Sequence, residues 1–105
     1  MQFGISTHLY HDQRLGREHL AQIAGYGFEA VELFATRSHF DYHDPSAIEQ
    51  LAGWLNETRL TLHSIHLPIF EAFGPDGPGT TYSIASGDSA RRQAAVREAE
   101  AAINI

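Results

Sequence analysis

The sequence contains no cysteine and no lysine. Without cysteine it offers no disulfide, no thiolate nucleophile and no sulfur-ligated zinc or iron–sulfur site. Without lysine it offers neither a lysine Schiff base nor the lysine contact of a P-loop. All seven basic residues are arginines, and the formal net charge is −6. Because binding to a phosphate backbone depends on clustered basic side chains, this composition argues against nucleic acid as a partner.

Long apolar runs are also missing. No segment reaches the roughly 20 apolar residues that a membrane-spanning helix needs, so no membrane partner is expected. The first residues lack the basic and apolar regions of a signal peptide, which favours a cytoplasmic location. The 105 residues are 43% hydrophobic and 19% charged, with seven histidines. This composition is typical of one small globular domain spanning residues 1–105.

Three β-rich segments alternate with three segments of helical periodicity. Gly27 is a natural stop for the first helix, since glycine accepts the left-handed conformation. The second helix has two possible starts: Asp44 followed by Pro45, or a capping box of Ser46 and Glu49. We expect strands near residues 3–8, 28–34 and 60–67, and helices near residues 16–26, 45–57 and 89–105.

The order βαβαβα with helix-length connections predicts an α/β fold with a parallel sheet. Parallel sheets normally have both faces buried within larger folds. Three strands provide little such cover, and no stop signal follows the helical pattern at Ile103. We therefore expect this chain to be the front part of a larger α/β protein.

A glycine- and proline-rich segment follows the third strand. Residues 68–87 form a loop pattern with Gly74-Pro-Asp-Gly-Pro-Gly79 at its centre. The segment lacks the order Gly-x-x-x-x-Gly-Lys-Ser/Thr of a phosphate-binding loop. A lid over a binding site and a disordered segment are both compatible with this pattern.

A polar side chain stands near the end of each predicted strand: His8, Glu32 and His66. The carboxyl ends of parallel strands are where α/β folds carry their sites. His66 could bind a metal or a substrate through a neutral imidazole, or could simply bond a backbone carbonyl. Glu32 lies in an apolar strand, where a carboxylate is costly to bury unless it is paired or solvated. It could accept a bond from a substrate hydroxyl, or pair with an arginine.

The other histidines are weaker candidates. His63 precedes His66 by three residues and should face the opposite side of a regular strand. His19 is expected at the surface of the first helix. Ser64 shares a strand face with His66, but nothing in the sequence marks it as an activated nucleophile. The three remaining histidines fall in loops over the same edge, where solvated positions are the ordinary expectation: His11, His39 and His43.

Three segments together resemble the first strands of xylose-isomerase-like TIM barrels, the superfamily of sugar-phosphate isomerases and epimerases that also includes endonuclease IV. They are Phe3-Gly-Ile-Ser-Thr7, Gly27-Phe-Glu-Ala-Val-Glu-Leu-Phe34 and Leu62-His-Ser-Ile-His-Leu-Pro68. Residues 86–105 are similar to the family's third helix. The resemblance implies the first three βα units of a (βα)8 barrel, truncated after the third unit.

The resemblance also implies a function for the complete protein. Many family members interconvert or epimerise sugars or sugar phosphates with the help of a divalent metal, and most of the metal ligands lie on later strands. The third-strand histidine, matched by His66, is a metal ligand in endonuclease IV and often a substrate contact in the sugar enzymes. His8 and Glu32 would contribute to substrate binding. The fragment alone is expected to be inactive, because most of the metal ligands are absent.

Two alternatives remain open. One is an endonuclease-IV-like, metal-dependent phosphodiesterase acting on abasic DNA, against which the net charge of −6 counts. The other is a non-catalytic module that forms a homo-oligomer by covering its own open sheet edges.

Overall fold

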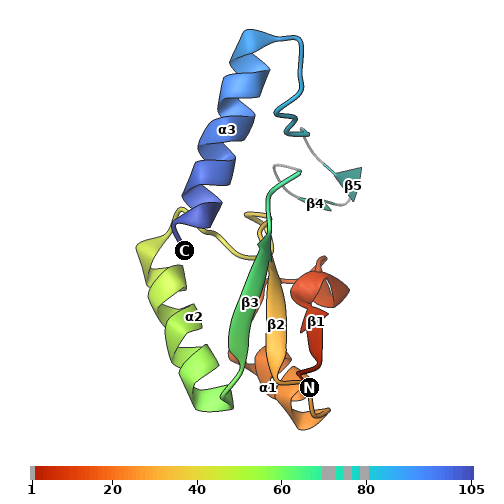
Figure 1. Ribbon diagram of the computed structural model, residues 1–105, viewed down its shortest axis with the longest axis vertical. Helices are drawn as coiled ribbons and strands as arrows, with labels where there is room; N and C mark the ends of the chain where they lie inside the picture. The colour runs from red at the N-terminus through yellow and green to blue at the C-terminus, as the bar shows by residue number, and fades with distance from the viewer. Residues whose placement is uncertain (1, 70–72, 75–76, 79–80) are drawn as a thin grey trace.

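The chain folds as an α/β unit around a three-stranded parallel sheet, as the sequence predicts (Figure 1). The computed structural model describes residues 2–69, 73–74, 77–78 and 81–105. The strands are β1 (Gly4–Ser6), β2 (Ala30–Phe34) and β3 (Thr61–His66), hydrogen-bonded in the order β1-β2-β3. The helices that connect them are α1 (Arg17–Gly25) and α2 (Pro45–Thr58). Each strand is thus followed across the sheet by the next in sequence.

The first strand is shorter than expected. It ends at Ser6, and a 3-10 helix, η1 (Thr7–Tyr10), follows at once. The Ser6 hydroxyl accepts a hydrogen bond from the backbone N–H of His8 at 3.1 Å. This cap turns the chain out of the sheet. His8 therefore lies in the turn after β1 and not at the end of the strand.

Local signals set the ends of the two connecting helices. Asp44 caps α2 by accepting a hydrogen bond from the Ser46 N–H at 2.9 Å, so the Asp44-Pro45 start is confirmed. Gly27 follows α1 with a φ of 93°, the left-handed conformation that ends many helices. Arg59 ends α2 in the same left-handed region, with a φ of 60°.

Both connecting helices pack against the same face of the sheet. Along β2, Val31 and Leu33 point into the core, and Glu32 between them points to the opposite face. Burying a large aliphatic side chain stabilises the fold by roughly 1.5–3 kcal/mol. The buried members of the core are Leu15, Leu20, Ile23, Val31, Leu33, Ala35, Phe40, Tyr42, Leu51, Leu60 and Ala102.

The third helix, α3 (Ser89–Ile103), does not cover the sheet. Figure 1 shows it extending beyond the carboxyl ends of the strands, with its last turn beside the start of α2. Only Ala95 and Ala102 are buried along it, whereas Val96 and Ile103 are 40% and 65% exposed. Alanine offers little apolar area to bury, so packing on the sheet would gain α3 little free energy. This position differs from the third βα unit expected from the sequence.

The glycine- and proline-rich segment contains two short antiparallel strands, β4 (Phe73–Gly74) and β5 (Gly77–Pro78). The other residues of Gly74–Gly79, which are 75, 76 and 79, lie outside the described residues. These two strands do not distinguish a lid over a binding site from a disordered segment. Among the helices of the described ranges, none is long and apolar enough to cross a membrane.

Candidate functional site

An irregularity in β3 shapes the open face of the sheet. The register pairs Val31 with Leu62 but Glu32 with Ser64, so one extra residue, His63, is inserted into β3. Leu62 and Ile65 both pack against the core, on either side of this insertion. A bulge of this kind interrupts the regular alternation of side chains. The expectation that His63 faces away from His66 assumed a regular strand, and the bulge removes that basis.

The bulge lies beside a groove of about 400 Å³ on the open face. Glu32, His63 and Ser64 line this groove from β2 and β3. We call it the bulge groove. Its full lining is Gln2, Gly4, Ile5, Ser6, Ala30, Val31, Glu32, His63 and Ser64. A signal for it existed in the sequence: the apolar residues Leu60, Leu62, Ile65 and Leu67 are spaced by two, three and two, and the spacing of three marks the bulge.

Glu32 is half-buried and is oriented by a neighbouring strand. The Ser64 hydroxyl donates a hydrogen bond to Glu32 Oε2 at 2.8 Å. The arginine partner considered from the sequence is not what holds this carboxylate, since its described hydrogen bond comes from serine. A carboxylate carries more than one acceptor site on each oxygen, so Glu32 can still accept bonds from a ligand.

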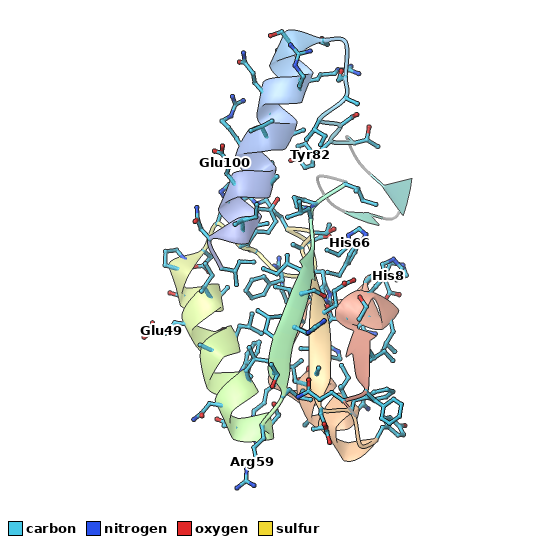
Figure 2. The ribbon with its side chains drawn as sticks, in the orientation of Figure 1. His8, Glu49, Arg59, His66, Tyr82 and Glu100 are labelled. Carbon is cyan, nitrogen blue, oxygen red and sulfur yellow. The ribbon has the colours of Figure 1, made fainter. Side chains whose placement is uncertain are left out.

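His8 and His66 meet around one aromatic ring at the carboxyl end of the sheet. The Phe34 ring lies 4.6 Å from the His8 ring and 5.4 Å from the His66 ring, measured between centroids. Figure 2 shows both labelled histidines at the end toward which the strands point. Phe34 itself is only 1% exposed. Two of the three predicted site residues, His8 and His66, therefore contact Phe34. The third, Glu32, lies two residues before Phe34 on β2 and lines the bulge groove.

The exposed His66 has a defined tautomer. Its Nδ1 lies 3.1 Å from the backbone oxygen of Leu67. A carbonyl oxygen can only accept, so Nδ1 carries the proton and donates it. In the neutral ring, Nε2 then keeps its lone pair. One ring nitrogen thus bonds a backbone carbonyl, and in the neutral ring the other nitrogen can bind a metal or accept a proton.

His39 is a buried structural residue and not the solvated loop residue expected. Its Nδ1 donates to the Gln13 carbonyl at 2.7 Å, and its Nε2 accepts from the Thr7 hydroxyl at 3.0 Å. The same hydroxyl accepts from the Phe34 N–H at 2.9 Å. Burial lowers the pKa of His39, although the bond to the Gln13 carbonyl opposes this shift. These bonds tie η1 to the end of β2, which positions His8 beside Phe34.

His19 is also buried, contrary to its expected place at the surface of α1. Its Nδ1 accepts a hydrogen bond from the Gly16 N–H at 2.9 Å, and its Nε2 lies 3.2 Å from Gln13 Oε1. A side chain three residues into a helix that reaches back to the cap is the reciprocal half of a capping box. Histidine performs this role here instead of the usual glutamate.

The loop histidines have local partners. His11 Nδ1 donates to the His8 carbonyl at 3.1 Å, and the two rings stack with centroids 4.9 Å apart. His43 is exposed, and its Nε2 lies 2.7 Å from Glu98 Oε2 on α3. Neither lines the bulge groove.

Glu98 joins α3 to the loop before α2. The Tyr42 hydroxyl donates to Glu98 Oε2 at 2.6 Å, and the Tyr82 hydroxyl lies 3.4 Å from Oε1. Burial raises the pKa of Glu98, but hydrogen bonds from Tyr42 and His43 outweigh it, and the net shift is downward. Burial, followed by the bond to Glu98, raises the pKa of Tyr42. This contact is structural and lies apart from the bulge groove.

The described residues do not assemble a metal centre by themselves. No group of three or more His, Cys, Asp or Glu side chains that could hold a metal ion occurs among them. His8 and His66 each contact the Phe34 ring.

Searches against protein-family models, curated proteins and solved structures found no match to this chain.

Proposed function

We propose that the chain forms the first units of a (βα)8 barrel, and that the complete protein is a metal-dependent isomerase or epimerase of a sugar or sugar phosphate. The observation that carries this proposal is the difference between the two faces of the sheet. Both connecting helices cover one face, and the other bears the polar bulge groove. In a closed barrel the uncovered face becomes the interior, and the carboxyl ends of the strands carry the site.

The main competing architecture is a doubly wound sheet. Such a sheet is covered by helices on both faces, so its strands are apolar on both sides. Here the second face presents Ser6, Glu32 and Ser64, which are partly exposed. A polar second face supports the barrel over the doubly wound alternative.

Each predicted residue has a distinct role in this proposal. Glu32, held by Ser64, accepts a hydrogen bond from a substrate hydroxyl. His66 directs the lone pair of Nε2 toward substrate or metal while Nδ1 is held by its backbone bond. His8 lies against the same Phe34 ring and lines the substrate side of the carboxyl edge. The remaining ligands of the divalent metal would come from strands other than β1, β2 and β3, since the described residues lack a ligand group.

The test follows by NMR the conversion of aldoses and aldose phosphates to their ketoses or epimers, with a divalent metal added to the protein made from the complete reading frame. Glu32→Gln and His66→Asn should each lower kcat/KM by about 100-fold, the usual range for losing a positioned polar or proton-transferring group. Glu49→Gln is the matched control, because Glu49 is exposed and points away from the sheet on α2 (Figure 2). Turnover and metal content that both survive the two site substitutions would rule out the site assignment.

One observation favours the non-catalytic alternative. β1 and β3 are both edge strands of the described sheet, so each has one side without a strand partner. Open edges are sites where chains pair with one another. Light scattering that shows a defined oligomer, together with no turnover by the complete protein, would favour a self-associating module. For the phosphodiesterase alternative, the groove lining contributes no arginine to bind phosphate.

A further inference from the structure

We propose that the bulge groove binds an uncharged, polyhydroxylated small molecule, and that His63 is a recognition residue of this site. The proposal deepens the proposed function and rests on it for the role of Glu32. It adds a residue outside the predicted set and selects one class of ligand, neutral polyols, over phosphorylated ones.

The first support is the position of His63. The extra residue places His63 and Ser64 side by side in the lining of one groove, opposite Glu32 on β2. A regular strand would turn one of the two toward the core. Bulges next to binding sites commonly serve to redirect a side chain in this way. Leu62 and Ile65, on either side of the insertion, both still pack against the core.

The second support is the hydrogen-bonding capacity of the lining. Glu32 offers acceptors, with Oε2 already held by Ser64. The Ser6 oxygen accepts from the His8 N–H, which leaves the Ser6 hydroxyl proton to donate. A neutral His63 adds one donor and one acceptor. A lining that offers both donors and acceptors matches hydroxyl groups, because each hydroxyl both donates and accepts.

The third support is charge. The groove is lined by one carboxylate, from Glu32, and by no arginine, and the sequence has no lysine. An anionic phosphate would therefore meet repulsion from Glu32 with no arginine or lysine in the lining to offset it. The groove volume of about 400 Å³ lies within the range of small-molecule sites.

The test is a titration of the ¹⁵N-labelled protein, made from the complete reading frame, with ribitol and, separately, with ribitol 5-phosphate, followed by amide chemical shifts. Ribitol should produce saturable shifts centred on Ser6, Glu32, His63 and Ser64. Ribitol 5-phosphate should bind at least tenfold more weakly. Equal or tighter binding of ribitol 5-phosphate would overturn the inference. So would amide shifts that do not saturate with ribitol up to about 100 mM.

Three variants test the residues. His63→Ala and Glu32→Gln should each weaken ribitol binding about tenfold, the equivalent of one hydrogen bond. Glu49→Gln is the matched control and should bind as the parent does. Deletion of His63 should restore regular alternation, with Leu62 and Ile65 still in the core, and should abolish binding while circular dichroism stays unchanged. Ribitol binding that survives both His63 changes would exclude His63 from the site.

The two proposals fail in different ways. If the groove binds ribitol through His63 but the complete protein converts none of the sugars or sugar phosphates, the isomerase proposal fails and the groove assignment stands. If conversion occurs but His63→Ala leaves both conversion and ribitol binding unaltered, the inference about the groove fails and the isomerase proposal stands.

Discussion

Single residues in this chain decide how the strand ends are arranged. His39 is the clearest case, since it is fully buried and has hydrogen-bond partners on both ring nitrogens. Through Thr7 and Phe34 it connects η1 with the last residue of β2. A buried polar group with all its partners is costly to alter, because each deleted bond leaves another group unsatisfied.

His39→Asn should lower the free energy of unfolding by about 2–4 kcal/mol at pH 8, through lost hydrogen bonds and a partly filled cavity. It should also flatten the pH dependence. The pKa of His39 lies below its ordinary 6.5 because of burial, so the unfolded chain takes up the proton first. Stability contributed by neutral His39 is thus present above about pH 6.5 and lost as the pH falls below it. Urea unfolding between pH 8 and 5 checks this; parallel curves for parent and variant would contradict it.

Two residues at helix ends form a natural comparison. Arg59 and Gly27 both follow a helix in the left-handed conformation, with φ of 60° and 93°. Arg59→Gly should raise the free energy of unfolding by about 0.5–1 kcal/mol, because glycine has no Cβ to strain there. The side chain of Arg59 is exposed and extends away from the end of α2 (Figure 2), so little contact is lost.

Gly27→Ala provides the opposite change. Nothing lies within 4 Å of a Cβ added at Gly27, so its backbone conformation is the only source of strain. The substitution should lower the free energy of unfolding by about 1 kcal/mol. Thermal and urea unfolding give the free energy of unfolding of both variants. Changes of the same sign in the two variants would contradict the claim that the left-handed conformation favours glycine at both helix ends.

At the scale of elements, α3 is held by few contacts. Its buried residues are alanines, and its hydrogen bonds to the loop before α2 run from Glu98 to Tyr42 and His43. An element with little buried apolar area depends more on such bonds for its local stability.

Glu98→Gln should therefore loosen α3 more than the sheet, with a global cost of about 1–2 kcal/mol for weakened charged hydrogen bonds. Hydrogen exchange should accelerate in α3 and stay nearly unchanged in β2. The pKa of Glu98 lies below its ordinary 4.5, so its contribution is present above about pH 4.5 and lost as the pH falls through the folded-state value. An equal rise in exchange over α3 and β2 would show that α3 is not a separately held element.

The element pattern was predictable to the extent that local signals determined it. Alternating strand and helix segments, the Asp44 cap and the Gly27 stop are properties of short stretches of sequence. The bulge was not predicted because it depends on pairing with β2. The spacing of three residues between Leu62 and Ile65 is consistent with it. His19 and His39 both bond to Gln13, which lies outside their own segments. The polarity of the neighbouring residues therefore could not predict that these two histidines are buried. The position of α3 depends on tertiary contacts that its alanine-rich sequence leaves weakly specified.

At the scale of the whole molecule, the two faces of the sheet are unequal. One is packed by α1 and α2, and the other holds the bulge groove and ends at the rings of His8 and His66. The proposed barrel explains this difference, because the polar face would be enclosed by further strands. It also explains why a ligand group for the metal is incomplete among the described residues.

The most direct test of the proposed barrel is the sequence of the encoding DNA and its transcript beyond the codon for Ile105. The barrel predicts an in-frame continuation with about five further βα units, carrying Glu, Asp and His at the strand ends. A reproducible stop codon directly after Ile105 would contradict it and would make the self-associating module the better proposal.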